Sequence, residues 1–237
     1  MPHIVVINES TAMSDADIRK MLPAFQQQWN ADLKSAWQVE HASFHFLPQR
    51  KAPAAASWWL VFLDNSDQAS ALAYHDLTND GYPVSKVFVK MLLTQGASVS
   101  LAASHELCEM AVDPWLNAAY QDAGGAFWAA EICDPVEGEQ YGYQIGDILV
   151  SDFVTPNWYA HRHGQADMDF QGHAHGAFEV LAGGYAQKFD ALSGWLQITG
   201  SAVKEAKAHA AAGSRRERRA RQSQQNLHRS DVAWNRD

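Results

Sequence analysis

The sequence predicts an α+β protein whose first half is a mixed sheet with two main helices, followed by a half rich in strands and loops. Through Pro114, periodic segments follow the order strand, helix, three or four strands, helix; beyond it, short aromatic runs alternate with glycine. The 237 residues are 47% hydrophobic and 11% aromatic, which is ample for a packed core. We therefore expect three regions, residues 1–114, 115–200 and a tail at 201–237.

The first strand and helix are predicted from local signals. The β-branched run "HIVVIN" at 3–8 is typical of a strand, and Ser14 with acidic Asp15 and Asp17 after it indicates a helix start. Pro23 is a point where this helix can kink. Apolar residues at spacings of three and four predict the face that packs on the sheet: Ile18, Met21, Leu22, Phe25, Trp29, Leu33 and Trp37.

Four further segments of the first half are predicted as strands, and a helix closes it. The strand candidates are residues 39–47, the dense apolar run "WWLVFLD" at 58–64, and residues 71–77 and 86–93. The segment 95–114, "QGASVSLAASHELCEMAVDP", has helical spacing, and the residue before Pro114 disfavours the α conformation. This helix is therefore expected to end at Asp113.

The second half is expected to form strands and long loops. Its candidate strands lie in 126–135, 141–154, 177–189 and 194–200, all aromatic and bounded by glycine. Residues 201–212 favour a helix by propensity alone, and the rest of the tail lacks a period that could form a core.

The charge distribution separates the body from the tail. The chain has a formal charge of −9, yet residues 201–237 contain nine Lys/Arg and four Asp/Glu. An acidic body gives no reason to expect general nucleic-acid binding, whereas "SRRERRAR" at 214–221 can contact an acidic partner or nucleic-acid phosphate, or remain solvated.

The sequence contains no export or membrane signal. The start "MPHIVVINES" lacks a charged stretch before an apolar run, and no apolar run approaches the roughly 20 residues that span a bilayer. We expect a cytoplasmic protein, or one released or virion-associated without a signal peptide, with no membrane partner. Cys108 and Cys133 are expected as buried thiols, with a mutual disulfide or zinc ligation as alternatives.

The stretch "SHELCE" at 104–109 carries a candidate metal site. A helix brings positions i and i+4 onto one face, so His105 and Glu109 can hold a cation together, while Glu106 lies about 100° round the helix. Zinc accepts carboxylate oxygen as well as imidazole nitrogen. The alternative is a solvated helix that contains His-Glu by chance, but the largely apolar flanks make a buried, uncompensated charge cluster costly.

A second acidic cluster can complete this site. "EICDPVE" supplies Glu131, Asp134 and Glu137 at 22 to 28 residues beyond Glu109, a suitable distance for a third ligand returning from a later segment.

These motifs resemble known families. The order of elements resembles the N-terminal half of zincin metallopeptidases, in which an edge strand precedes the His-Glu helix. The blocks "SHELCEMAVDPWLN" and "EICDPVEGEQYGY" resemble plant EXORDIUM-type phosphate-induced proteins. Residues 3–199, through "WWLVFLDNSDQASALAYHDLT" and "LVSDFVTPNWY", look like a family of uncharacterised bacterial and phage-associated proteins, which brings no established reaction.

The zincin resemblance implies roles for individual residues. His105 and Glu109 would bind one zinc ion, Glu106 would be the catalytic base, and Glu131 the third ligand with Asp134 behind it, or these two would exchange roles. Glu109 stands where zincins have a second histidine, which puts peptidase activity in more doubt than metal binding.

Other clusters have weaker signals. The pairs His161/His163 and His173/His175 can form a second metal site or reach the main one, although a surface loop fits their polar surroundings better. Tyr141 and Tyr143 can stabilise an oxyanion or simply pack.

Two functions are therefore expected from the sequence. The first is a zinc-dependent hydrolase of the metallopeptidase type with a HExxE motif, acting on a peptide or protein. The alternative is a non-catalytic structural or interaction protein, such as a virion or secretion-apparatus component, with a stabilising metal or a remnant site.

Overall fold

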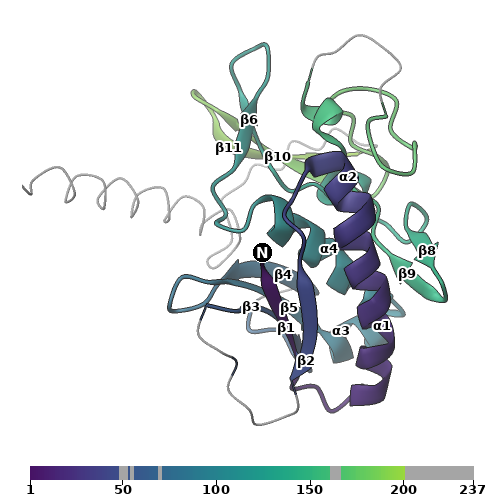
Figure 1. The fold of residues 1–237 in the computed structure, drawn as a ribbon. Helices are drawn as coiled ribbons and strands as arrows, with labels where there is room; N and C mark the ends of the chain where they lie inside the picture. Colours follow the sequence, from purple (N-terminus) through teal and green to yellow (C-terminus); the bar gives the residue numbers. More distant parts are fainter. Residues whose placement is uncertain (48–52, 54–55, 69–70, 161–166, 201–237) are drawn as a thin grey trace, which may run out of the picture.

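The computed structural model describes residues 1–200 except 48–52, 54–55, 69–70 and 161–166, and it has the predicted α+β class. Figure 1 shows a sheet with helices beside it in the first half and a second, strand-rich half above it. The predicted helix at 201–212, the basic run at 214–221 and the pair His161/His163 lie outside the described residues. No helix within the described part of the chain is long and apolar enough to cross a membrane.

A five-stranded mixed sheet forms the base of the molecule. Its strand order is β2-β1-β3-β5-β4, with β4 antiparallel to β5 and the other neighbours parallel. The strands are β1 (His3–Asn8), β2 (Ser43–Leu47), β3 (Trp58–Leu63), β4 (Ala73–Leu77) and β5 (Pro83–Phe88). The antiparallel strand β4 therefore ends the described sheet on the side where the candidate site lies.

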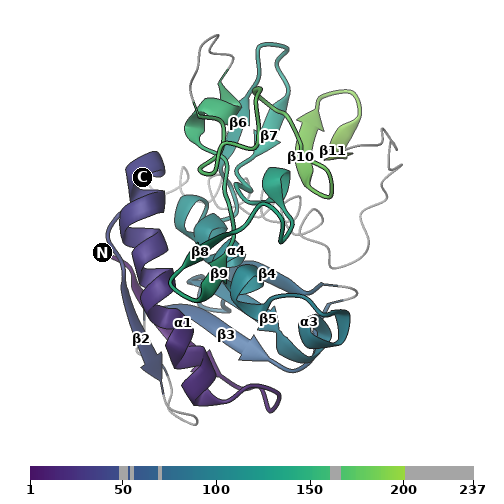
Figure 2. The same cartoon turned by 90° about the vertical axis from the view of Figure 1, so that its right-hand side faces the viewer.

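One long helical segment covers a face of this sheet (Figures 1 and 2). It runs through α1 (Asp15–Gln27), a π-helical stretch η1 (Gln28–Leu33) and α2 (Lys34–Trp37). Ser14 caps it as predicted, because its side chain accepts a hydrogen bond from the Asp17 amide. The helix passes through Pro23, and most of the predicted apolar face is buried: Ile18, Met21, Phe25, Trp29 and Leu33.

One predicted strand is corrected by the structure. The segment 86–93 is expected as a strand, but β5 ends at Phe88 and α3 (Val89–Gln95) follows. The buried residues of α3, Val89 and Leu92, are three apart, which is helical spacing. The nearly continuous apolar run at 86–93 hides this spacing in the sequence. Gly96 ends α3 with a positive φ of 70°, a conformation that glycine adopts without strain.

The helix α4 (Val99–Val112) carries the His-Glu motif and packs against β4, β5 and, from the second half, β9 (Ile148–Val150). Ser98 caps its start by accepting from the Leu101 amide, and it ends at Asp113 before Pro114, as the sequence predicts. Most of its residues are buried, which places its polar side chains inside the protein.

The second half is built from short strands and loops, as predicted (Figure 2). An antiparallel sheet has the order β11-β10-β7-β6, and β8 pairs with β9 in a separate hairpin. These elements are β6 (Ala119–Gln121), β7 (Phe127–Ala129), the 3-10 turn η2 (Asp134–Val136), β8 (Tyr143–Ile145), β9 (Ile148–Val150), the 3-10 turn η3 (Pro156–Tyr159), β10 (Tyr185–Asp190) and β11 (Gly194–Thr199).

Hydrogen bonds join this half to the first. Gln28 Nε2 donates to the Ser151 carbonyl at 2.8 Å, and Trp37 Nε1 donates to the Val154 carbonyl at 2.8 Å. Helix α4 contacts both the sheet, through β4 and β5, and the second half, through β9.

Candidate metal centre

Three ligand candidates come from α4. His105, Glu106 and Glu109 are 5%, 3% and 0% exposed, so none is part of a solvated helix face. Ser85 on β5 donates its hydroxyl to the Glu106 carbonyl at 3.3 Å, which fixes this turn of α4 against the sheet. The interpretation of the motif as a solvated helix that contains His-Glu by chance is therefore wrong.

Two further candidates come from the segment that follows β7. Glu131 is 2% exposed and Asp134 is 0% exposed. The backbone here is held by the Val154 amide, which donates to the Ile132 carbonyl at 2.7 Å. The Cys133 amide approaches Glu109 Oε1 at 3.4 Å, so the segment is attached directly to α4.

A sixth ligand candidate, His75 on β4, joins these five side chains and is absent from the sequence-based prediction. It is 1% exposed and lies opposite Ser85 in the antiparallel register of β4 and β5. A histidine inside the apolar strand candidate at 71–77 was the available signal, but only the pairing of β4 with β5 brings it above α4.

His105 forms one compact group with Glu109 and Asp134. Its Nε2 lies 3.2 Å from Glu109 Oε1 and 3.1 Å from Asp134 Oδ1. Ligand atoms that bind one tetrahedral zinc at about 2.0–2.2 Å are about 3.3–3.6 Å apart. The distances from His105 Nε2 to these two oxygens are therefore close to the ligand–ligand distance in a zinc site. The ion pairs keep the three side chains together when no metal is bound.

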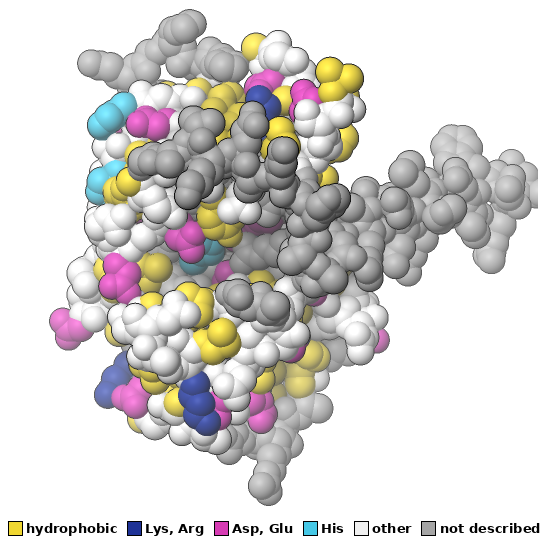
Figure 3. Space-filling model, turned by 180° about the vertical axis from the view of Figure 1, so that it is seen from behind, with side chains coloured by type: hydrophobic (Ala, Val, Ile, Leu, Met, Phe, Trp, Pro, Cys, Tyr) yellow, Lys and Arg dark blue, Asp and Glu magenta, His cyan; other side chains and the backbone are white. Residues whose placement is uncertain are grey.

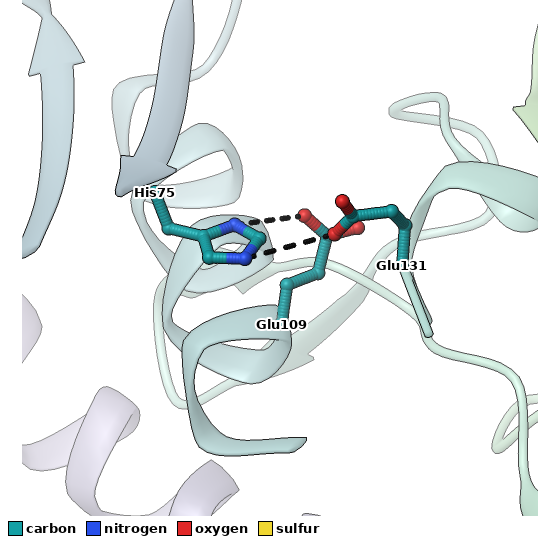
Figure 4. Close-up of side chains that lie close together, drawn as sticks. All are labelled: His75, Glu109 and Glu131. Carbon is teal, nitrogen blue, oxygen red and sulfur yellow. Dashed lines mark ion pairs between the residues drawn. The ribbon is translucent and has the colours of Figure 1, made fainter. Parts of the chain in front are cut away.

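His75 forms a second group with Glu109 and Glu131 (Figure 4). Its Nδ1 lies 3.4 Å from Glu109 Oε2 and 3.3 Å from Glu106 Oε2, and its Nε2 lies 3.7 Å from Glu131 Oε2. The ring thus stands between carboxylates of α4 and of the segment after β7.

The surrounding acids control the protonation of both histidines. Burial alone would lower the pKa of His75, but Glu131 and the hydrogen bonds with Glu106 and Glu109 raise it to about 10. The pKa of His105 is likewise raised well above its ordinary value, because Glu109 and Asp134 outweigh the effect of burial. In the absence of a cation, the cluster binds protons in its place.

The predicted ligands are therefore brought together, but in two groups. One ligand atom from each of His105, Glu109 and Asp134 lies within 4.8 Å of the other two, and the same holds for His75, Glu109 and Glu131. Asp134 thus lies beside His105. From the sequence, Glu131 is the first choice for that position. The described residues include a metal-binding geometry, which confirms the expectation of a site able to hold a cation.

The remaining candidates lie elsewhere. Tyr141 donates to the Ala182 carbonyl and Tyr143 donates to Asp32, at 3.2 and 2.8 Å. Cys108 and Cys133 are free, buried thiols, as expected.

Tyr159 is another buried side chain at this cluster that the sequence does not indicate. Its hydroxyl donates to the Ala129 carbonyl at 3.1 Å. Burial, with Glu131, Glu109 and Asp134 nearby, raises its pKa well above the ordinary value.

His173 belongs to a separate group. Its Nδ1 lies 3.2 Å from Asp152 Oδ2 and 3.4 Å from Asp169 Oδ2, and these three side chains also have metal-binding spacing. Burial and the carboxyl of Asp169 raise the pKa of Asp152 to about 9. His175 is exposed and is not a member of this group.

Comparison of the chain with models of protein families, with curated proteins and with solved structures found no match. On the face drawn in Figure 3, acidic side chains adjoin a histidine near mid-height. Imidazole nitrogen and carboxylate oxygen together suit a divalent cation such as zinc.

Proposed function

We propose that this protein is a zinc-dependent hydrolase, with peptide bonds as its substrate class. The observation that carries the proposal is the convergence of two histidines and four carboxylates, each at most 5% exposed, from β4, α4 and the segment after β7. Buried charges in proteins are paired or bind metals, because desolvating them is costly.

The roles follow the positions of the side chains. His105, Glu109 and Asp134 hold the zinc, since His105 Nε2 already lies at close to the tetrahedral ligand spacing from an oxygen of each acid. When bound, zinc supplies a Lewis acid that polarises a carbonyl and acidifies water. Glu106, one residue along α4 from His105, accepts the proton of the attacking water at its carboxylate.

Strand β4 carries His75 into the site. A peptide or protein substrate is the class that the zincin resemblance implies.

The proposal is tested by hydrolysis of a fluorogenic peptide library. We expect cleavage by the zinc-loaded protein, loss on chelation and recovery with zinc. Glu106→Gln should lose cleavage while retaining zinc, because the amide cannot accept a proton. The matched control is Glu9→Gln, at an exposed glutamate, and it should behave as wild type. Equal cleavage by Glu106→Gln would contradict the role of Glu106.

A second candidate function is structural, with zinc as a stabilising ion in a non-catalytic protein. The observation that favours it is the burial of every ligand candidate, which restricts access of a substrate. This candidate predicts that chelation lowers the melting temperature while no library member is cleaved. A binding partner for the tail would then be sought among acidic proteins and nucleic acids.

A further inference from the structure

We propose that the cluster binds two metal ions, with Glu109 as the bridging ligand and with His75 and Glu131 holding the second ion. The proposal rests on the zinc site inferred above and extends it. Two-metal hydrolytic sites hold their ions about 3.5–4 Å apart and stabilise both the attacking and the leaving oxygen.

The first step is that the candidate ligands divide into two groups. The groups His105–Glu109–Asp134 and His75–Glu109–Glu131 share Glu109 alone. Two atoms bound to one ion at about 2.0–2.2 Å can be no more than about 4.4 Å apart. One ligand atom from each member of a group lies within 4.8 Å of the other two, close to that limit, so each group can hold an ion of its own.

The second step is the orientation of Glu109. Its Oε1 lies 3.2 Å from His105 Nε2, and its Oε2 lies 3.4 Å from His75 Nδ1. Glu109 therefore lies between the two histidine rings, on the Nδ1 side of His75, and a shift of its Oε2 toward Nε2 would bring that oxygen to the second ion. A carboxylate placed in this way can give one oxygen to each ion.

The third step is the state of His75. Its Nε2 is buried and makes no hydrogen bond in the described part of the chain; Glu131 Oε2 lies 3.7 Å away. Its Nδ1 lies 3.3 Å from Glu106 Oε2. A carboxylate on one ring nitrogen fixes the tautomer and leaves the other nitrogen free to bind a metal. A buried nitrogen without a hydrogen bond requires an explanation, and a metal ion supplies one.

The fourth step is charge. As metal ligands both histidines are neutral. Four carboxyl side chains, those of Glu106, Glu109, Glu131 and Asp134, lie in the cluster, a number that suits two divalent ions better than one. Nitrogen and oxygen ligands of this kind suit zinc and manganese.

The test measures metal stoichiometry. Wild-type protein and variants are stripped with a chelator, dialysed against zinc and analysed for zinc per chain. We expect two ions in wild type, one in His75→Ala and one in His105→Ala. The matched control is His41→Ala, at an exposed histidine, and it should retain two.

Manganese tests the bridge in the wild-type protein itself. Wild-type protein loaded with Mn²⁺ should give the electron paramagnetic resonance spectrum of an exchange-coupled pair. His75→Ala should give only the six lines of an isolated ion. Two uncoupled ions in wild type would overturn the bridging role of Glu109.

The remaining outcomes separate this inference from the proposed function. One zinc in both wild type and His75→Ala overturns the second ion and leaves the zinc site of the proposed function intact. No zinc in wild type overturns both. Two zinc ions in His75→Ala place the second ion elsewhere and overturn the assignment.

Discussion

Glu109→Gln is expected to be the most damaging single change at the metal centre. Glu109 is 0% exposed, and its two oxygens lie 3.2 Å from His105 and 3.4 Å from His75. Glutamine keeps the shape but removes the charge and replaces one oxygen with an amide nitrogen that cannot bind a cation. Both histidine groups therefore lose a ligand at once.

The magnitude of this effect is estimated for zinc affinity and for stability. Changing a residue that only supports a metal ligand costs about 10–100-fold in affinity, so loss of a shared ligand should exceed about 100-fold, or about 2.7 kcal/mol. Without metal, His75 remains protonated at pH 7, since its pKa is about 10. Removing one partner of such a buried pair costs about 3–5 kcal/mol.

Two assays measure these effects. Competition with a chromophoric chelator gives the zinc affinity, and urea unfolding in the presence of chelator gives the stability of the metal-free protein. Glu106→Gln is the comparison, since Glu106 approaches His75 at 3.3 Å as a supporting carboxylate; its zinc affinity should fall by less than about 100-fold, so that it still binds zinc in the cleavage assay. If Glu109→Gln binds zinc within threefold of wild type, Glu109 is not a ligand and the arrangement proposed here fails.

Three other predictions concern the surroundings of the site. Gly184→Ala should lower stability by about 1–3 kcal/mol and weaken zinc binding, because the new Cβ would lie 2.7 Å from the Asp134 carbonyl; unchanged affinity would show that this contact is unimportant. Cys108 and Cys133 should resist a thiol reagent in the native protein and both react after unfolding without reductant, and a need for reductant would reveal a disulfide. The stability of Asp152→Asn relative to wild type should increase as the pH rises from 5 to 8, as measured by unfolding in the presence of chelator. A stability difference that does not change with pH would refute the raised pKa of Asp152. The folded carboxyl holds its proton up to a pKa of about 9 and the unfolded one only to 3.8, so wild type loses at most about 1.4 kcal/mol per pH unit over this range.

Local signals account for the elements that the sequence predicts correctly. Ser14 and Asp17 define a helix start within four residues, and Asp113-Pro114 defines the end of α4. The i, i+4 relation of His105 and Glu109 is likewise a property of one helix, so their proximity follows from the sequence once the helix is recognised.

The parts that the sequence does not predict depend on distant pairing. His75 reaches the site only because β4 pairs antiparallel with β5, and nothing within residues 71–77 specifies that partner. Whether Glu131 or Asp134 lies beside His105 depends on the irregular backbone after β7, which has no periodicity to analyse. The helix at Val89–Gln95 was missed because a short apolar run fits a strand and a buried helix equally.

Diffraction from crystals grown with zinc, recorded on both sides of the zinc absorption edge, tests the central claim most directly. The account predicts an anomalous peak about 2.0–2.3 Å from His105 Nε2 and from a carboxylate oxygen of Glu109. Crystals of His105→Ala should lack that peak. An anomalous peak beside His173 with none near Glu109, or no peak in a crystal of folded protein, would contradict a metal centre on α4.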